Sequence, residues 1–388
     1  MAEKFLDALL RRDGLGVYMF SPACSCCKAP LGGDTRLFRC TQCGEFLQCA
    51  NGLLLRHALT PLHAVQEWNG HHWVTARLSG EGSLGLIYQI GHHGFPCEFP
   101  GQERSMVVLD LSGIHKIRYR FCEWNAWYPA STIDPETCAT LDTLETFRLL
   151  NVVGNMNVQD FVGTLERKTD PLRVGELLDR YKAFGYMAHQ YNFELCAKRT
   201  GRGHTEDGIT KATPGAFTVL CWPCPHESKN LPEGWRDVET KYKFLYMLLI
   251  AMDANFRLKN RLRANENEDL ALRAGNGYFV EDTGYKQHLR TYVAEKDAST
   301  CIAFTALLQK ETRMTSGLQC SGVGGCVCAR HGVIRPQGLG DLQKGERYAN
   351  MDYILLSALL GVTLLALTIS YDISDGQSRF LRPFMGRL

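Results

Sequence analysis

The chain has 388 residues, of which 45% are hydrophobic and 22% charged, and its formal net charge is +2. This length allows two to four domains, and the composition is too apolar for a disordered chain. The near-neutral charge excludes a protein that coats polyanions with its whole surface, so any contact with nucleic acid must come from local basic patches.

Cysteine and histidine are the informative residues, with 16 and 12 copies. The N-terminal segment has no apolar core of signal-peptide length, which predicts an intracellular chain. In a reducing compartment, short-spaced cysteine pairs indicate metal ligands rather than disulfides. The composition therefore predicts a globular, zinc-containing protein.

The N-terminal tail, residues 1–20, contains one predicted amphipathic helix at residues 3–12. Residues 21–66 lack hydrophobic periodicity, as expected of a small module in which metal ions replace a core. The spacing of the cysteines and histidines in residues 21–66 predicts two zinc sites with a cross-braced arrangement of ligands. The candidate ligands of one ion are Cys40, Cys43, His57 and His63, and those of the other are Cys24, Cys27 and Cys49. Gly52 stands where a fourth cysteine would fall, and Cys26 is the alternative.

Residues 73–122 are β-like. Met106–Leu109 is a short apolar run, and after it Lys116, Arg118 and Arg120 alternate with apolar residues, which predicts a strand with one basic face. That face could follow a phosphate backbone, although a solvated face is the commoner use of such a pattern.

Three sparser sets of residues are further zinc candidates, with ordinary hydrogen-bonded side chains as the alternative. The first contains His92 or His93, Cys97, His115 and Cys122. The second contains His204, Cys221, Cys224 and His226. The third is Cys326, Cys328 and His331, whose only evident partners are Cys301 and Cys320.

The middle of the chain is predicted to be helical at residues 142–168 and 172–198, with Gly201–Gly203 ending the second helix. The glycine-rich stretch 321–325 lacks the residues of a phosphate-binding loop and is interpreted as a turn. Residues 354–369 are uncharged but too short for a typical membrane span, so a buried helix, a turn near Gly361 and a buried strand are predicted instead.

The C-terminal third has two aspartates at the ends of predicted buried strands. Residues 244–252 form a continuous apolar run that Asp253 follows at once, and the run at 363–369 ends close to Asp372. Carboxylates at one sheet edge are typical of two-metal phosphodiester cleavage with magnesium or manganese. Asp341, Glu346 and Asp352 are candidates for a third acid, and the alternative is that both aspartates merely cap turns. A basic cluster follows Asp253, at Arg257, Lys259, Arg261 and Arg263.

Several stretches in this order resemble fungal Kyakuja-Dileera-Zisupton (KDZ) transposases. They include GRGHTEDGI, LCWPCPHESKNLPEGW, LIAMDANFRLKNR, VCARHGVIRPQGLGDLQKGERYANMDYILLSAL and ISYDI. The preceding IGHHGFPC, GIHKIRYRFC and WYPAS resemble the CxC-type cysteine-cluster domain that accompanies these transposases, and the N-terminal pairs resemble the zinc module that opens them.

The resemblance implies a mixed α/β chain whose last part is a ribonuclease H-like nuclease core that cuts and joins DNA. It assigns the first two catalytic acids to Asp253 and Asp372. The family's glutamate lies far downstream, whereas 16 residues follow Asp372 here, so the core is expected to be incomplete and inactive. The expected organisation is a tail (1–20), a small zinc-stabilised module (21–66), the CxC-type domain (67–170), a helical linker with Cys/His residues (171–236) and the truncated nuclease-like domain (237–388).

The preferred interpretation is a nuclear, transposase-derived protein that contains structural zinc, binds DNA and does not enter membranes. Two alternatives stay open. One is an active transposase in which Glu346 or Asp352 supplies the third carboxylate. The other is a cross-braced zinc module that binds protein partners and has no DNA chemistry.

Overall fold

A computed structural model covers the chain. Only the backbone is described for Phe121, Asn260, Arg261 and Tyr292. The residues that the structure describes are 2–91, 98, 101–121, 127–131, 135–172, 174–175, 178–206, 208–227, 229–258, 260–261, 275–292, 318–343, 347–364 and 366–371.

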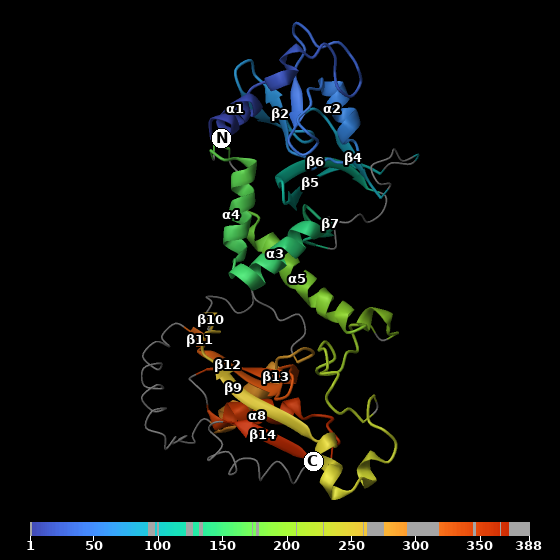
Figure 1. Ribbon diagram of the computed structural model, residues 1–388, viewed down its shortest axis with the longest axis vertical. Coiled ribbons are helices and arrows are strands. Elements are labelled where there is room, and N and C mark those ends of the chain that lie inside the picture. Colours follow the sequence, from blue (N-terminus) through green and yellow to red (C-terminus); the bar gives the residue numbers. More distant parts are fainter. Residues whose placement is uncertain are drawn as a thin grey trace. The chain divides into compact units, whose positions relative to one another are not determined.

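The chain divides into two compact units, Met1–Asn192 and Phe193–Leu388. The first unit begins with the predicted N-terminal helix, none of whose residues is buried. A small antiparallel sheet in the order β1-β2-β3 follows it (Figure 1). The elements of this part are α1 (Ala2–Asp13), the 3-10 helix η1 (Gly16–Phe20), β1 (Phe38–Cys40), α2 (Ala50–His57), β2 (Val65–Trp68) and β3 (Trp73–Ala76).

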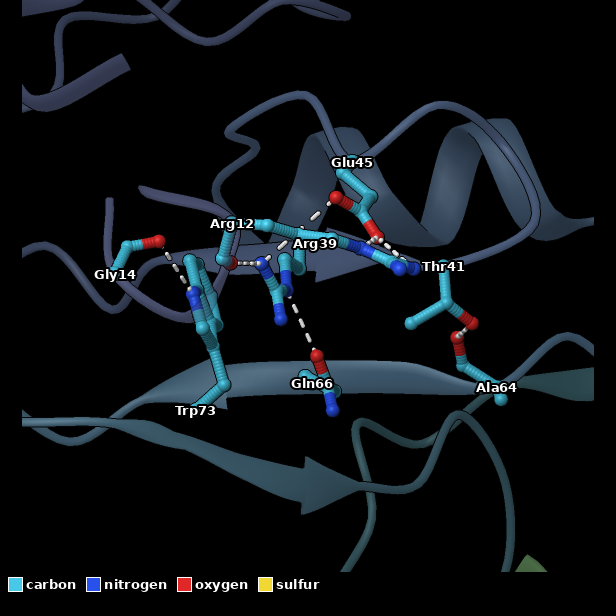
Figure 2. A network of polar contacts seen from close by, with 8 residues as sticks. All are labelled: Arg12, Gly14, Arg39, Thr41, Glu45, Ala64, Gln66 and Trp73. Atoms are coloured by element: carbon cyan, nitrogen blue, oxygen red, sulfur yellow. Dashed lines mark hydrogen bonds and ion pairs between the residues drawn. The ribbon is translucent and has the colours of Figure 1, made fainter. Parts of the chain in front are cut away.

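Arg39 connects this sheet to the end of α1, as Figure 2 shows. Its guanidinium donates to the Arg12 carbonyl at 2.5 Å and to Gln66 Oε1 at 2.7 Å. It also lies 4.4 Å from the ring centroid of Trp73, which in turn donates from Nε1 to the Gly14 carbonyl at 2.9 Å. Burial lowers the pKa of Arg39. A buried cation is tolerated here because its donors have acceptors and its face has an aromatic ring.

A five-stranded mixed sheet in the order β4-β6-β5-β8-β7 forms the rest of the first unit's β structure. The alternation predicted for residues 116–120 is present in β6, where Ile117 and Tyr119 are buried and Lys116 is exposed. The predicted run at 106–109 lies in β5. The strands are β4 (Ile87–Ile90), β5 (Glu103–Asp110), β6 (Gly113–Phe121), β7 (Trp127–Pro129) and β8 (Thr137–Thr140).

Helices α3 (Leu141–Gly154), α4 (Val158–Thr169) and α5 (Tyr181–Arg199) pack together around Phe147, Phe161 and Phe184. The single helix predicted for residues 142–168 was wrong, because the chain breaks between α3 and α4. Asn155 has a left-handed φ of 51° that ends α3, and the side chain of Asn157 accepts from the Asp160 N–H and starts α4.

The next helix also begins later than predicted. Leu178, within the range predicted to be helical, is 67% exposed and precedes α5. Its predicted end is confirmed, since Gly201 takes a left-handed φ of 76° just after the last turn.

The second unit contains a four-stranded sheet in the order β13-β12-β9-β14, in which only β14 runs parallel to its neighbour β9 (Figure 1). A short β10-β11 pair lies apart from it. The elements are η2 (Arg202–His204), η3 (Trp235–Asp237), η4 (Thr240–Tyr246), β9 (Leu248–Asn255), β10 (Asn260–Arg261), α6 (Asp282–Tyr292), β11 (Leu318–Cys320), β12 (Gly322–Cys328), β13 (Ile334–Leu342), α8 (Tyr348–Ala358) and β14 (Leu367–Tyr371).

Two predictions for this sheet were wrong in detail. The strand expected at 244–252 starts at Leu248, after a 3-10 helix, and continues beyond Asp253. The glycine-rich stretch is strand β12 rather than a turn. A Cβ at Gly324 would lie 2.7 Å from Met351 Sδ and 2.9 Å from Ile354 Cδ1, so glycine is needed where α8 packs on the strand.

The apolar segment at 354–369 is the predicted helix, turn and strand rather than a membrane span. Helix α8 packs on β13 and β12, and Gly361 turns the chain with a φ of 76°. The strand β14 is more exposed than predicted, since only Tyr371 in it is buried. In the part of the chain that the structure describes, no helix has the length and apolarity needed to cross a bilayer.

Replacing Arg39 by alanine is expected to lower the free energy of unfolding of the first unit by about 1–3 kcal/mol, because the acceptors it serves are left unpaired. Arg36→Ala is the matched control. Its guanidinium pairs with Glu67 at 2.6 Å but is 61% exposed, so its loss should cost less than about 1 kcal/mol. Urea unfolding of the zinc-loaded chain checks both, and equal losses would contradict the role given to Arg39.

Candidate metal centres

The first candidate centre consists of Cys40, Cys43, His57 and His63, the four residues that the sequence spacing assigns to one ion. Their ligand atoms all lie within 4.8 Å of one another. Cys43 Sγ is 3.5 Å from His57 Nε2 and 3.2 Å from His63 Nδ1, and Cys40 Sγ is 3.6 Å from the same Nδ1. Tetrahedral zinc with Zn–S of about 2.3 Å and Zn–N of about 2.0–2.1 Å places such atoms about 3.5 Å apart. The donor set and its spacing therefore fit zinc.

The hydrogen bonds and the burial of these side chains favour the binding of a metal cation. His57 Nδ1 lies 2.8 Å from the Leu53 carbonyl, one turn earlier in α2, which requires the proton on Nδ1 and leaves Nε2 free to bind a metal. Burial lowers the pKa of His57 and of His63, which favours the neutral imidazole that binds a metal. Burial raises the pKa of Cys40 to about 11, so metal binding must displace its proton.

The second candidate centre has three of the predicted ligands, Cys24, Cys27 and Cys49. Cys27 Sγ and Cys49 Sγ are 3.4 Å apart. Burial acts to raise the pKa of Cys24, but hydrogen bonds from backbone N–H groups of the same loops lower it to about 7. The alternative ligand Cys26 is not part of this group.

Gly52 borders this three-thiol group directly. A Cβ on it would lie 2.5 Å from Cys24 Sγ and 3.4 Å from Cys27 Sγ, and its N–H donates to Cys49 Sγ at 3.4 Å. The sequence position that lacks a cysteine is therefore also the place in space where a fourth ligand would belong.

The third candidate centre joins two pairs that the sequence does not connect. Cys221 and Cys224 meet Cys328 and His331, more than 100 residues later, with all ligand atoms within 4.8 Å. Cys224 Sγ lies 3.1 Å from Cys328 Sγ, and His331 Nδ1 lies 3.4 Å from Cys221 Sγ. Burial acts to raise the pKa of Cys328, yet its hydrogen bonds with Cys224 and His331 lower it to about 7.

The other residues predicted for this region lie elsewhere. His204 is exposed and outside the group, and His226 contacts the Cys221 carbonyl through Nε2 at 2.9 Å. Cys320 and Cys326 are buried, and burial raises the pKa of Cys326 to about 12. The sequence did contain one signal for this centre. Cys221 with Cys224 and Cys328 with His331 are each a pair that needs two more ligands to complete a zinc site.

The remaining predicted set is described only in part. His92, His93, Cys97 and Cys122 lie outside the described residues, as does Cys301. His115 Nε2 is 2.8 Å from Ser112 Oγ, whose neighbour is Asp110 Oδ2, and burial lowers the pKa of His115 to about 4. A zinc site at this set stays a prediction.

The predicted basic residues differ in their exposure and in whether they form an ion pair. Arg118 is paired with Glu103 at 2.5 Å, whereas Lys116 and Arg257 are exposed and Arg120 is half-buried. Lys259 and Arg263 lie outside the described residues, and the side chain of Arg261 is not described.

The predicted acids do not form a centre within the described residues. Asp253 is exposed on β9 and accepts only from the Ala254 N–H at 2.7 Å, and no described group of three metal ligands includes it. Asp352 is 4% exposed inside α8, and Asp341 is half-buried in β13. Asp372 and Glu346 lie outside the described residues. Met252, just before Asp253, pairs in register with Tyr371, just before Asp372.

Two segments match known protein-family models. Residues 246–381 match the Kyakuja-Dileera-Zisupton (KDZ) transposase, and residues 82–173 match the CxC2-like cysteine cluster associated with KDZ transposases. No curated protein and no solved structure matches the chain.

Replacing Cys328 by serine is expected to lower the zinc content by one ion per chain, because a four-ligand structural site rarely survives the loss of a thiolate. Cys326→Ala is the matched control, since Cys326 lies on the same strand, is fully buried and is not in the group. Elemental analysis of protein purified under reducing conditions measures both. Equal zinc in the two variants would show that Cys328 is not a ligand.

Replacing Gly52 by cysteine is expected to give zinc binding at the second centre at least about tenfold tighter than replacing it by alanine, the lower end of the effect of an outer-shell partner. Both variants add the same Cβ beside Cys24, and only cysteine adds a thiolate. Zinc retained after dialysis against graded chelator distinguishes the two. If cysteine and alanine behave alike, Gly52 does not border an open ligand position.

Proposed function

Because residues 246–381 are a KDZ transposase domain and residues 82–173 its associated cysteine-cluster domain, we propose that the chain is a zinc-stabilised DNA-binding protein of transposase origin. The observation that carries the proposal is that match, together with three groups of cysteine and histidine in which thiol and imidazole atoms lie at zinc spacing. Structural zinc holds the loops, and the transposase domain supplies the contact with DNA. A nucleus is the compartment in which such a protein meets its DNA.

The topology of the second unit supports a ribonuclease H-like core. Strands β9, β12 and β13 form an antiparallel meander, α8 crosses the sheet, and β14 returns parallel to β9 on its free side. This arrangement is the one expected of the first four strands of such a core. The packing of α8 on the sheet explains the apolar residues at the start of the 354–369 stretch, since Ile354, Leu355 and Ala358 are buried.

Asp253 and Asp372 are the proposed magnesium or manganese ligands of this core. Each directly follows a member of the register pair Met252 and Tyr371 on parallel strands, so both belong to the same edge of the sheet by sequence. Hard carboxylate oxygens are the ligands that these ions prefer. When bound, such ions activate water and stabilise a leaving oxygen in phosphodiester cleavage.

DNA binding by the chain is expected to weaken steeply with salt, because its cations act in patches. Four phosphate contacts would give a slope of about −3.6 in log K against log salt concentration. Arg257→Gln should reduce the magnitude of that slope by about 0.9, and Arg236→Gln should not, because Arg236 is already paired with Glu227. Fluorescence anisotropy of labelled duplex DNA, recorded at salt concentrations between about 50 and 200 mM, measures this slope. Affinity independent of salt would refute phosphate contacts as the main interaction.

The chain as described is not expected to nick DNA above background in magnesium or manganese. Among the described residues, Asp253 belongs to no group of three metal ligands, and Asp352 is buried in α8 rather than available as a further acid. A site that lacks one anionic ligand loses several powers of ten in rate, at about 1.4 kcal/mol each. A supercoiled-plasmid assay tests this. Metal-dependent nicking that Asp253→Ala abolishes would instead establish the active-transposase alternative.

A further inference from the structure

An exposed tryptophan lies between the two cysteines of the third candidate centre. Trp222 is 82% exposed, although tryptophan is highly buried on average. It lines an open hollow of about 510 Å³ in the second unit, beside Arg199, Arg202 and Lys229. A single exposed apolar residue means little by itself, so the argument depends on how the ring is held and on the charge around it.

The loop that carries Trp222 is fixed at both ends. Cys221 and Cys224 belong to the Cys/His group, and Asn230 Nδ2 donates to the Trp222 carbonyl at 3.1 Å and to the Cys224 carbonyl at 2.7 Å. The His226 N–H donates to Asn230 Oδ1 at 2.7 Å. Since this ordering is already present in the free protein, a ligand that contacts the ring loses little entropy in fixing the loop.

The charge around the ring is positive and uncompensated. No acidic residue lines the hollow, and no described carboxylate forms an ion pair with Arg199, Arg202 or Lys229. Elsewhere in the same unit the cations Arg236 and Lys286 do have such partners, in Glu227 and Asp282. A flat aromatic ring surrounded by free cations fits a ligand with planar groups along an anionic backbone.

We propose that this hollow binds an unpaired stretch of DNA, with one base stacked on Trp222 and the flanking phosphates on Arg199, Arg202 and Lys229. The choice of DNA depends on the proposed function. Both faces of a base in a duplex are covered by its neighbours, so an indole ring can stack only on a base that is unpaired or displaced. The three cations then follow the backbone on either side without reading its sequence.

The test uses the full zinc-loaded chain and a labelled thymidine oligonucleotide of about 12 nucleotides, within the site sizes of such grooves. Trp222→Ala should weaken its binding about 5- to 150-fold, the range measured for one stacked base. Trp222→Phe should recover part of this loss. Phe244→Ala removes another exposed aromatic ring from the same unit, 56% exposed, and should change nothing.

An abasic chain of the same length separates stacking from charge. It should bind wild type and Trp222→Ala equally weakly, whereas Lys229→Gln should weaken both ligands and lower the magnitude of the salt slope by about 0.7. The proposal is overturned if Trp222→Ala leaves oligonucleotide binding unchanged, or if it weakens abasic and natural chains equally. It is also overturned if polyglutamate of matched charge binds with the same dependence on Trp222, since the site would then recognise an acidic protein.

Failure of this proposal and failure of the proposed function give different results. If duplex DNA binds in a salt-sensitive manner while Trp222→Ala has no effect on the oligonucleotide, only the stacking site is wrong. If the zinc-loaded chain binds neither duplex nor single-stranded DNA, the proposed DNA-binding function is wrong as well. Zinc content measured on every variant shows that the Cys221–Cys224 loop is intact.

Discussion

Four potential metal ligands constrain the N-terminal part of this chain more than its small apolar core does. In residues 38–76 the sheet has three short strands, and the buried apolar residues around Phe38 and Leu53 are few. The Cys40, Cys43, His57 and His63 group connects the end of β1, the end of α2 and the loop after it. A cation that draws these atoms together closes loops whose ordering the small core could not compensate. Arg39, next to Cys40, depends on the same closure because its acceptors belong to two separate segments, Arg12 in α1 and Gln66 in β2.

Local spacing was enough to predict the centres whose ligands are close in sequence. A Cys-x-x-Cys turn presents two thiols to one ion wherever it occurs, so the N-terminal groups could be paired from the printed residues. The third centre could not, because Cys221 and Cys224 meet Cys328 and His331 across more than 100 intervening residues. Spacing says nothing about which distant strands are neighbours. Incomplete ligand pairs are therefore the useful signal, since each requires a partner that the fold must supply.

The errors in the fold have equally local causes. The run at 244–252 is apolar throughout, and periodicity cannot separate a 3-10 helix from the strand that follows it. Gly154-Asn155-Met156-Asn157 contains both a helix stop and a helix start, but the apolar spacing continues across it. The glycines of β12 look like a turn in sequence, and only the close approach of α8 shows why they are in a strand. The ligand set around His115 and the acids Asp372 and Glu346 stay predictions.

The third centre lies at a position from which it influences the rest of the second unit. Cys328 ends β12 opposite Ile250, and Gly325 on the same strand lies opposite Asp253, three residues further along β9. At about 3.3 Å per residue, the backbone positions of Cys328 and the proposed catalytic aspartate are separated by about 10 Å along this pair of strands. Cys221 and Cys224 tie the Trp222 loop to the same strand through Cys328. The zinc would therefore do more than stabilise a loop: it would hold a DNA-stacking surface at a fixed distance from the carboxylate edge. A sheet without this metal would keep its paired strands, but the loop that carries Trp222 would no longer be tied to Cys328.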